Sequence, residues 1–279
     1  MTSLSDFNKY TGNLPRRDSV MPVLFIGHGS PLNGIEHNEF SDSWAKLAKE
    51  IPLPKAILVI SAHWLSRGTK ITAMDFPETI HDFGGFPKEL FEVQYPAPGS
   101  PELAKETAAI IQSAEVELTH DWGLDHGAWT VIRNMYPDAT IPVLQLSIDY
   151  TKGPQFHYEL AKELSSLRSK GVLLMGSGNM VHNLRMISFD RMDKEFGFDW
   201  AIEMNDIFKK HINNRNHQAL VNYESLGSGA KLAIPTPDHY YPLLYSLGLQ
   251  NKNDEAVIFN DKLMAGSLTM TSLKIGSSQ

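Results

Sequence analysis

The stretch VLFIGHGSP, residues Val23–Pro31, joins four consecutive apolar residues to a histidine that has a glycine on either side. A short apolar run bounded by turn residues predicts a strand that is covered on both faces. Glycines at its end mark places where the backbone bends sharply or is closely approached. The stretch therefore predicts a buried strand over 23–27 that presents His28 at its carboxyl end. A single histidine in such a place more often caps a turn than carries chemistry, so the other histidines decide its meaning.

The composition excludes several classes of protein. The chain has 279 residues, of which 42% are hydrophobic and 20% are charged, as in a globular protein with a sizeable core. A formal net charge of -7 leaves no broad basic surface for nucleic acid or an anionic membrane, so a small molecule is the expected partner. The absence of cysteine excludes disulfides, thiolate metal sites and a cysteine nucleophile. Any metal must be bound by His, Asp or Glu.

Strand-like runs alternate with segments of helical spacing along the chain. The runs lie at 23–27, 56–62, 141–148, 172–176 and 231–234, and the helical segments begin at Ser100, near Gln155 and near Trp200. This alternation predicts an α/β fold: a single-domain layered sandwich with a mostly parallel central sheet and helices on both faces. We expect residues 1–20 to form an arm on the surface and 21–279 to form the domain. Neither a signal peptide nor a membrane-spanning run is recognisable, which predicts a cytoplasmic protein without a membrane partner.

Four histidines share one kind of position, just past an apolar run or in a glycine-flanked turn. In an open α/β sheet, ligands bind beyond the carboxyl ends of the strands, so these four imidazoles should converge there on a metal ion. Imidazole ligands without cysteine favour iron(II) or zinc(II). The four are His28, His63, His182 and His239.

The remaining histidines divide into two groups. His126, in the sequence LDHGAW, is equally compatible with a structural role and with proton transfer, and His81, in HDFGGFP, is a candidate pocket residue. His81 lies in a Gly- and Pro-rich stretch, 76–100, which we expect to cover a site. The GxSxG, GxGxxG and HExxH motifs are absent, which argues against a serine hydrolase, a nucleotide-binding protein and a peptidase. The other histidines are predicted to lie on the surface: His37, His120, His157, His211 and His217.

Five motifs occur along the chain in this order: GHGSP, SAHW, DHGAW, GSGNMVHNL and TPDHYYPLLY. Together they resemble the motifs of the class III extradiol ring-cleaving dioxygenases, and most closely those of the DOPA 4,5-extradiol branch. The resemblance runs from about Met21 to about Leu268. It implies a nonheme iron(II) enzyme whose catalytic domain is 21–279. The implied reaction uses O2 to cleave the ring of a DOPA-like catechol in the extradiol position and gives a semialdehyde.

The resemblance also implies roles for individual residues. His28, His63 and His239 match the metal ligands, His182 matches a residue that is either a fourth ligand or the acid/base, and His126 matches a second active-site histidine. The wider class uses two histidines and a carboxylate, whereas this chain has His239 where the glutamate is expected.

Three neutral imidazoles leave the metal its full charge, so zinc(II) should bind the same site well. We take His182 as the preferred acid/base and His126 as the second choice, because histidine titrates near neutrality. Predicted substrate contacts are Ser30, His81, Asp238 and Tyr241.

Two other functions remain open at this level: an inactive binding protein on the same scaffold, and a zinc-dependent hydrolase. Oligomeric state is equally open between a monomer and a small homo-oligomer.

Overall fold

The strand predicted from the opening stretch forms at the predicted residues. In the computed structural model, which describes residues 20–192 and 194–277, β1 (Val23–Gly27) is buried along its whole length. Val23 and Phe25 join one apolar cluster, while Leu24 and Ile26 join another. Successive side chains of a strand point to opposite faces, so β1 contributes to a core on each side of its sheet. The predicted arm, apart from Val20, falls outside the described residues.

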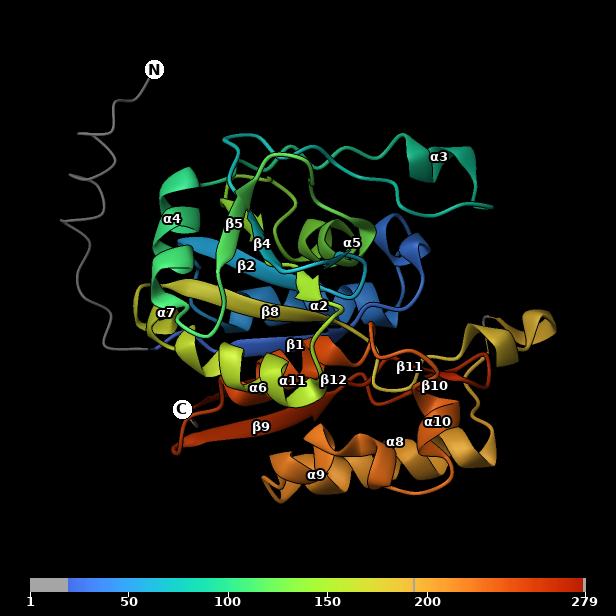
Figure 1. Ribbon diagram of the computed structural model, residues 1–279. Coiled ribbons are helices and arrows are strands. Elements are labelled where there is room, and N and C mark those ends of the chain that lie inside the picture. Colours follow the sequence, from blue (N-terminus) through green and yellow to red (C-terminus); the bar gives the residue numbers. More distant parts are fainter. Residues whose placement is uncertain (1–19, 193, 278–279) are drawn as a thin grey trace.

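Within the described residues, the central sheet has six strands in the order β6-β2-β8-β1-β12-β9 (Figure 1). The first four run parallel, β12 pairs antiparallel with β1, and β9 pairs antiparallel with β12. The sheet is therefore mostly parallel, as predicted, and the carboxyl ends of its parallel strands meet at one edge. Besides β1, the strands are β2 (Ala56–Ser61), β6 (Val143–Gln145), β8 (Val172–Gly178), β9 (Asp254–Phe259) and β12 (Ser272–Ser277).

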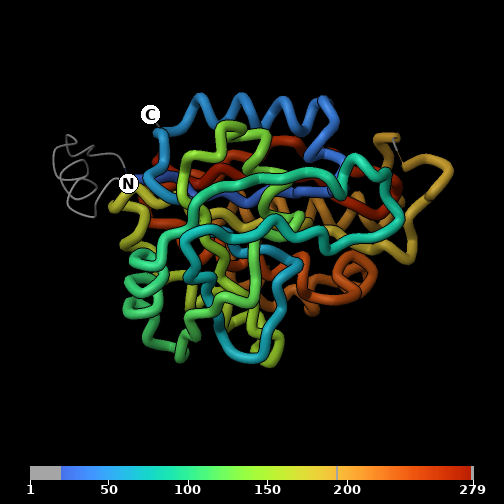
Figure 2. The backbone as a smooth tube through the Cα atoms, turned by 90° about the horizontal axis from the view of Figure 1, so that it is seen from above, coloured from blue at the N-terminus to red at the C-terminus, as the bar shows by residue number. Residues whose placement is uncertain are grey.

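Helices cover both faces of this sheet, which confirms the predicted layered sandwich in a single domain. On one face, α6 (Pro154–Glu163) and α11 (Tyr241–Gly248) pack against each other, and α11 packs on β1 and β8. On the other face, α5 (His126–Met135) packs on β2 and against α2 (Glu39–Glu50). Figure 2 shows α2, in blue, along one side of the molecule.

The remaining helices mostly follow the sequence signals. Ser100 caps α4 (Pro101–Ile110) by accepting a hydrogen bond from the Leu103 N–H, and Pro101 occupies the first helical position. The other two predicted helices form as α6 with α7 (Ser166–Ser169), and as α8 (Asp199–Asn213). Among the residues described, none of the helices combines the length and apolar character needed to cross a bilayer. The further helical segments are η1 (Pro31–Gly34), α3 (Lys88–Phe91), η2 (Leu184–Met186), η3 (Phe189–Arg191), α9 (His217–Val221) and η4 (Tyr223–Ser225).

Short strand pairs lie outside the central sheet. Two of the pairings are parallel, β3 with β7 and β4 with β5, and one is antiparallel, β10 with β11. These strands are β3 (Leu65–Ser66), β4 (Thr69–Thr72), β5 (Val116–Thr119), β7 (Ile148–Asp149), β10 (Leu263–Met264) and β11 (Leu268–Thr269).

Two strand predictions need correction. The run 231–234 is not a strand, because Ala230–Ala233 form the helix α10. Alanine, lysine and leucine favour helix, and Ala230 and Ala233, three positions apart, are both buried where α10 packs on α8. The run 141–148 divides into β6 and β7, which belong to different sheets.

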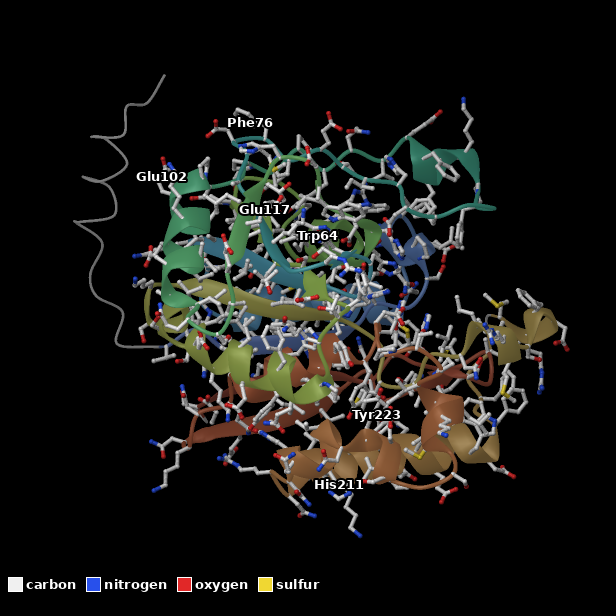
Figure 3. All side chains as sticks on the ribbon, viewed as in Figure 1. Trp64, Phe76, Glu102, Glu117, His211 and Tyr223 are labelled. Atoms are coloured by element: carbon white, nitrogen blue, oxygen red, sulfur yellow. The ribbon has the colours of Figure 1, made fainter. Side chains whose placement is uncertain are left out.

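One histidine that was predicted to lie on the surface is in the interior. His157, on α6, is fully buried; its Nδ1 lies 3.0 Å from the Tyr245 hydroxyl and its ring packs against Tyr241. His37 and His120 are exposed as predicted, and Figure 3 shows His211 on the outer side of α8. The surface prediction is therefore wrong for His157, because one polar residue does not reveal which side of an amphipathic helix it occupies.

A candidate metal centre

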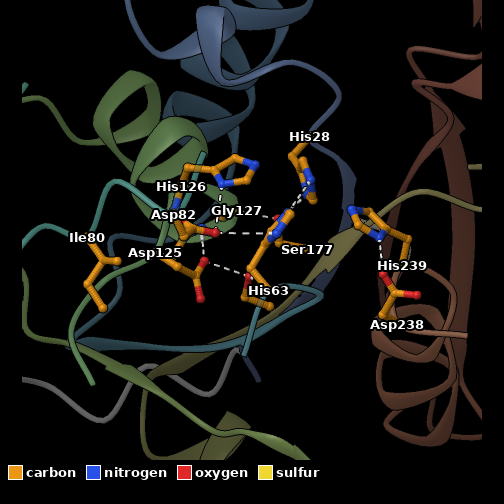
Figure 4. Close-up of polar contacts among 12 residues, drawn as sticks. His28, His63, Ile80, Asp82, Asp125, His126, Gly127, Ser177, Asp238 and His239 are labelled. Atoms are coloured by element: carbon orange, nitrogen blue, oxygen red, sulfur yellow. Dashed lines mark hydrogen bonds and ion pairs between the residues drawn. The ribbon is translucent and has the colours of Figure 1, made fainter. Parts of the chain in front are cut away.

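The predicted convergence of histidines is present at the carboxyl edge of the sheet (Figure 4). Among the described residues, His28, His63 and His239 each offer a ring nitrogen within 4.8 Å of those of the other two. The Nε2 atoms of His28 and His63 are 3.1 Å apart. The ring of His239 lies 5.4 Å from that of His28 and 4.9 Å from that of His63, centroid to centroid. The structure thus brings together three of the four histidines that the sequence pattern selects, and these three are the ones that the resemblance implies as metal ligands.

The glycines on either side of His28 have separate functions. A Cβ on Gly27 would lie 2.7 Å from the backbone of Met270, which is closer than atoms can pack. Gly29 adopts a φ of 64°, in the left-handed region that glycine enters without strain. The backbone of His28 itself is fixed at both ends, since its N–H donates to Gly178 and its C=O accepts from the Asn33 amide. The turn after β1 therefore holds the imidazole rigidly at the sheet edge.

His239 reaches the centre by another route from the one predicted. The segment before it is α10 and a turn rather than a strand, and α11 begins two residues after it. Its C=O accepts a hydrogen bond of 2.9 Å from the N–H of Asn179, just past the end of β8. His239 is therefore held to the sheet edge by a neighbouring strand.

The hydrogen bonds of Ser177 determine which nitrogen of His28 carries a proton. The Ser177 hydroxyl lies 2.5 Å from the Gly127 C=O, which can only accept, so the hydroxyl proton is donated there. Ser177 Oγ must then accept from His28 Nδ1, 3.0 Å away. His28 consequently carries its proton on Nδ1 and leaves Nε2 bare on the side facing His63.

In the other two histidines, His63 and His239, the partner of Nδ1 is a carboxylate instead of a serine. Asp238 Oδ2 lies 2.7 Å from His239 Nδ1, and Asp82 Oδ2 lies 3.4 Å from His63 Nδ1. Burial opposes ionisation of Asp238, but the hydrogen bond from His239 holds the pKa of this carboxyl below its usual range. Metal-binding histidines characteristically donate the second ring N–H to such a partner. All three therefore have Nε2 free for a metal ion.

Burial and mutual repulsion keep the rings of His28 and His63 neutral. Burial lowers the pKa of His28 and of His63 well below the usual histidine value, and the neighbouring imidazoles lower both further. Neutral imidazole is the form that binds metal. The Nε2 atoms of His28 and His63 face each other across 3.1 Å, and a cation bound between them would be attracted to both. The donor set fits a metal of intermediate softness, such as iron(II) or zinc(II).

His182 lies beside the trio rather than in it. Its ring stacks on that of His239, with centroids 3.5 Å apart and planes 6° from parallel. Its N–H donates to Ala233 C=O, which places it between β8 and α10. Burial lowers the pKa of His182 to about 2, so the ring is neutral. His182 thus has the position and charge state of a group next to a metal ion held by the trio.

His126 is joined to the centre by a carboxylate that was not predicted. Asp82 accepts from the His126 backbone N–H at 2.8 Å and lies 2.9 Å from its Nδ1. The His126 ring is 3.8 Å from that of His63, centroid to centroid. The one sequence signal for Asp82 was its place beside His81 in HDFGGFP.

A second unpredicted carboxylate lies beneath these histidines. Asp125 is fully buried and caps α5; its oxygens accept from the Ser61 hydroxyl at 2.6 Å and from the Gln145 amide at 2.6 Å. These bonds join the ends of β2 and β6 to the start of α5. They explain how the helix that carries His126 is held at the sheet edge.

The predicted substrate contacts lie in different surroundings. Ser30 caps η1 by accepting from the Leu32 N–H, and Asp238 holds His239. His81 lies 3.0 Å from the Val93 C=O, among the rings of Phe83, Phe91 and Trp129. Tyr241 packs against His157 at the start of α11. Contact with substrate remains a prediction for each of the four.

Comparison with known proteins agrees with this geometry. Residues 22–270 match the family described as the catalytic LigB subunit of aromatic ring-opening dioxygenase. A 4,5-DOPA dioxygenase extradiol of Escherichia coli K12 is 45% identical, covering 92% of this chain and 95% of its own. Another, from Beta vulgaris, is 34% identical, covering 93% and 98%. A crystal structure of an uncharacterized protein from Escherichia coli K12 superposes with a TM-score of 0.80 and 41% identity, covering 92% of this chain and all of that one. The chain belongs to the LigB family and is an aromatic ring-opening dioxygenase that requires a metal.

Proposed function

We propose that this enzyme cleaves the ring of a DOPA-like catechol, in the extradiol position, with O2 and gives a semialdehyde. The observation that carries the proposal is the histidine trio, in which every Nδ1 has a partner and every Nε2 is left for one metal ion. The names of the relatives, 4,5-DOPA dioxygenase extradiol, support the substrate class and the position of cleavage.

Iron(II) is the metal we propose for activity, held by His28, His63 and His239, and zinc(II) can occupy the same ligands. When bound, iron(II) supplies a Lewis-acidic centre for both catechol oxygens and for O2. Without a carboxylate among its ligands, such a centre keeps a full positive charge, which favours the ionised form of the catechol.

Proton transfer is the task of the second group of histidines. A catechol must lose its hydroxyl protons to bind as an anion, and a neutral imidazole within hydrogen-bond reach can accept one. We propose His182 for this role, because its neutral ring stacks on His239 beside the trio. His126 is the second candidate, since Asp82 holds its Nδ1 and leaves Nε2 bare. Ser30, His81, Asp238 and Tyr241 remain proposed substrate contacts.

The test is anaerobic loading with iron(II), followed by a set of catechols with and without the amino-acid side chain of DOPA. We expect O2 uptake and a yellow semialdehyde, with the highest kcat/KM for DOPA. The mass and the spectrum of the product identify the bond that was cleaved. Ring opening between the two hydroxyl groups, or a clear preference for catechols that lack the side chain, would contradict the proposal.

A further inference from the structure

Asp82 lies in a segment that crosses from the surface to the centre. The Ile80 N–H donates to the Leu124 C=O at 2.7 Å, and the Leu124 N–H donates to Glu78 C=O at 2.7 Å. Trp129, on α5, donates its indole N–H to the Ile80 C=O at 2.9 Å. The segment is thus bonded to the chain just before α5 and to α5 itself. This attachment delivers Asp82 to the metal centre from outside the sheet.

A single carboxylate oxygen of Asp82 serves two histidines. Its Oδ2 lies 2.9 Å from Nδ1 of His126 and 3.4 Å from Nδ1 of His63, while its Oδ1 accepts from the His126 N–H. The Asp82 side chain is only 15% exposed, so solvent competes little for these contacts. The carboxylate is therefore an acceptor placed between the two rings.

We propose that Asp82 is a positioning residue that orients His63 for the metal and His126 for the substrate side. By accepting at Nδ1, it leaves Nε2 of both rings without a proton. Asp82 makes two contacts with His126, at 2.8 Å to its backbone N and 2.9 Å to its Nδ1. With His63 it makes one longer contact, of 3.4 Å to Nδ1. Removal of the carboxylate should therefore affect turnover mainly through His126 and metal affinity through His63.

The same three side chains could instead bind a second metal ion, since their ligand atoms also lie within 4.8 Å of one another. The observed contacts favour the positioning role, because Oδ2 is already engaged by both Nδ1 atoms and His63 is shared with the trio. Binding of one zinc(II) per chain by the purified protein supports the proposal. Two tightly bound ions, one of them lost on replacing Asp82, would overturn it.

The experiment combines zinc(II) competition titrations with steady-state kinetics of the iron-loaded enzyme. Asp82→Asn should weaken zinc affinity by roughly 10–100-fold and lower kcat more than it changes KM. Asp82→Glu, which keeps the carboxylate, should recover part of both losses. Asp75→Asn, at an exposed aspartate directly before the segment 76–100, is the matched control and should behave as wild type. Circular dichroism identifies any variant that fails to fold.

The decisive arm is a double-mutant cycle with His126→Gln. If Asp82 acts on turnover through His126, Asp82→Asn should have little further effect on kcat in the His126→Gln protein, while zinc affinity still falls. Fully additive losses in kcat, or wild-type zinc affinity in a folded Asp82→Asn protein, would overturn the proposal. The turnover arm rests on the function proposed above, but the zinc arm needs no substrate. A failure of ring cleavage is therefore distinguishable from a failure of the Asp82 role.

Discussion

His28 shows how one hydroxyl group fixes which ring nitrogen of a proposed metal ligand carries the proton. Ser177 has a single proton, and the Gly127 C=O takes it, so the serine oxygen can only accept from His28 Nδ1. A rotated ring or the other tautomer would leave a buried donor or acceptor without a partner, which costs about 1–3 kcal/mol. Ser177 thus selects the orientation in which Nε2 faces the other ligands.

Ser177→Ala should therefore weaken metal binding although it touches no metal. We expect affinity for zinc(II) to fall by roughly 10–100-fold, because His28 loses the partner that orients it. Competition titration against a chelator measures this loss, and Ser225→Ala, at an exposed serine, is the control. Unchanged affinity in the Ser177→Ala protein would show that packing alone orients His28.

His182→Ala separates a proton-carrying role from a ligand role. If the stacked ring carries a proton, the variant should retain iron and bind catechol but lose roughly 10²–10⁴-fold in turnover. Iron content and turnover are measured on one preparation, with His211→Ala, on the outer side of α8, as control. Loss of iron in proportion to activity would make His182 a fourth ligand, and near-normal turnover would exclude both roles.

The sequence identified the histidines of the centre but neither of the carboxylates that hold His63 and His126 in place. His28 directly follows the apolar strand β1 and His63 lies two residues after β2, and this position is readable from a local pattern. Asp82 lies in an irregular segment whose path depends on bonds to Leu124 and Trp129, far along the chain. Asp125 was visible only as a neighbour of His126. Such contacts depend on tertiary structure, and local periodicity does not encode them.

Secondary-structure elements with a clear apolar run or apolar stripe were predictable, and the others were not. β1, β2 and β8 combine apolar runs with turn residues, and α8 has a clear apolar stripe. The run at 231–234 was too short for periodicity to distinguish a strand from a turn of helix. β9 and β12, whose exposure alternates or whose polar content is high, were missed as well.

The interface between α6 and α11 contains a histidine that should make stability depend on pH. Burial lowers the pKa of His157 to about 4, against about 6.5 in the unfolded chain. Between these two pKa values the unfolded state binds more protons than the folded state. The stability that the neutral His157 ring contributes is therefore complete above about pH 6.5 and is lost as the pH falls toward 4. The loss from this one group is at most about 1.4 kcal/mol per pH unit.

His157→Gln removes this titration, so the free energy of unfolding should fall less steeply with decreasing pH than in wild type. Denaturant unfolding of the metal-free proteins between pH 7 and 4 measures both slopes. The other histidines contribute to both proteins, so the difference isolates His157. Parallel slopes would mean that His157 is protonated in the folded state as readily as in the unfolded chain.

The segment 76–100 connects the surface to the candidate metal centre. It carries Asp82 to the centre and His81 and Phe83 to an aromatic cluster beside it. The hydrogen bonds of Glu78 and Ile80 to Leu124 and Trp129 attach it near its start. The expectation that it closes over bound catechol stays a prediction.

At the scale of the whole molecule, the fold explains why residues from five distant parts of the chain meet. The carboxyl ends of β1, β2 and β8 lie at one edge of the sheet, and the start of α5 and the turn before α11 are bonded to that edge. Fold class and the location of the site follow from the alternation of elements. Cytoplasmic location, the lack of a nucleic-acid partner and the choice between monomer and small homo-oligomer stay predictions from the sequence.

We propose that three imidazoles hold one metal ion with which the enzyme opens a catechol ring using O2. The most direct test measures iron content, O2 uptake and semialdehyde formation together, in the wild-type protein and in His239→Ala, after anaerobic loading with iron(II). We expect one iron per chain and one O2 consumed per ring opened in wild type, with iron and activity lost together in His239→Ala. Full iron content in the His239→Ala protein, or turnover of substrate without O2, would contradict it.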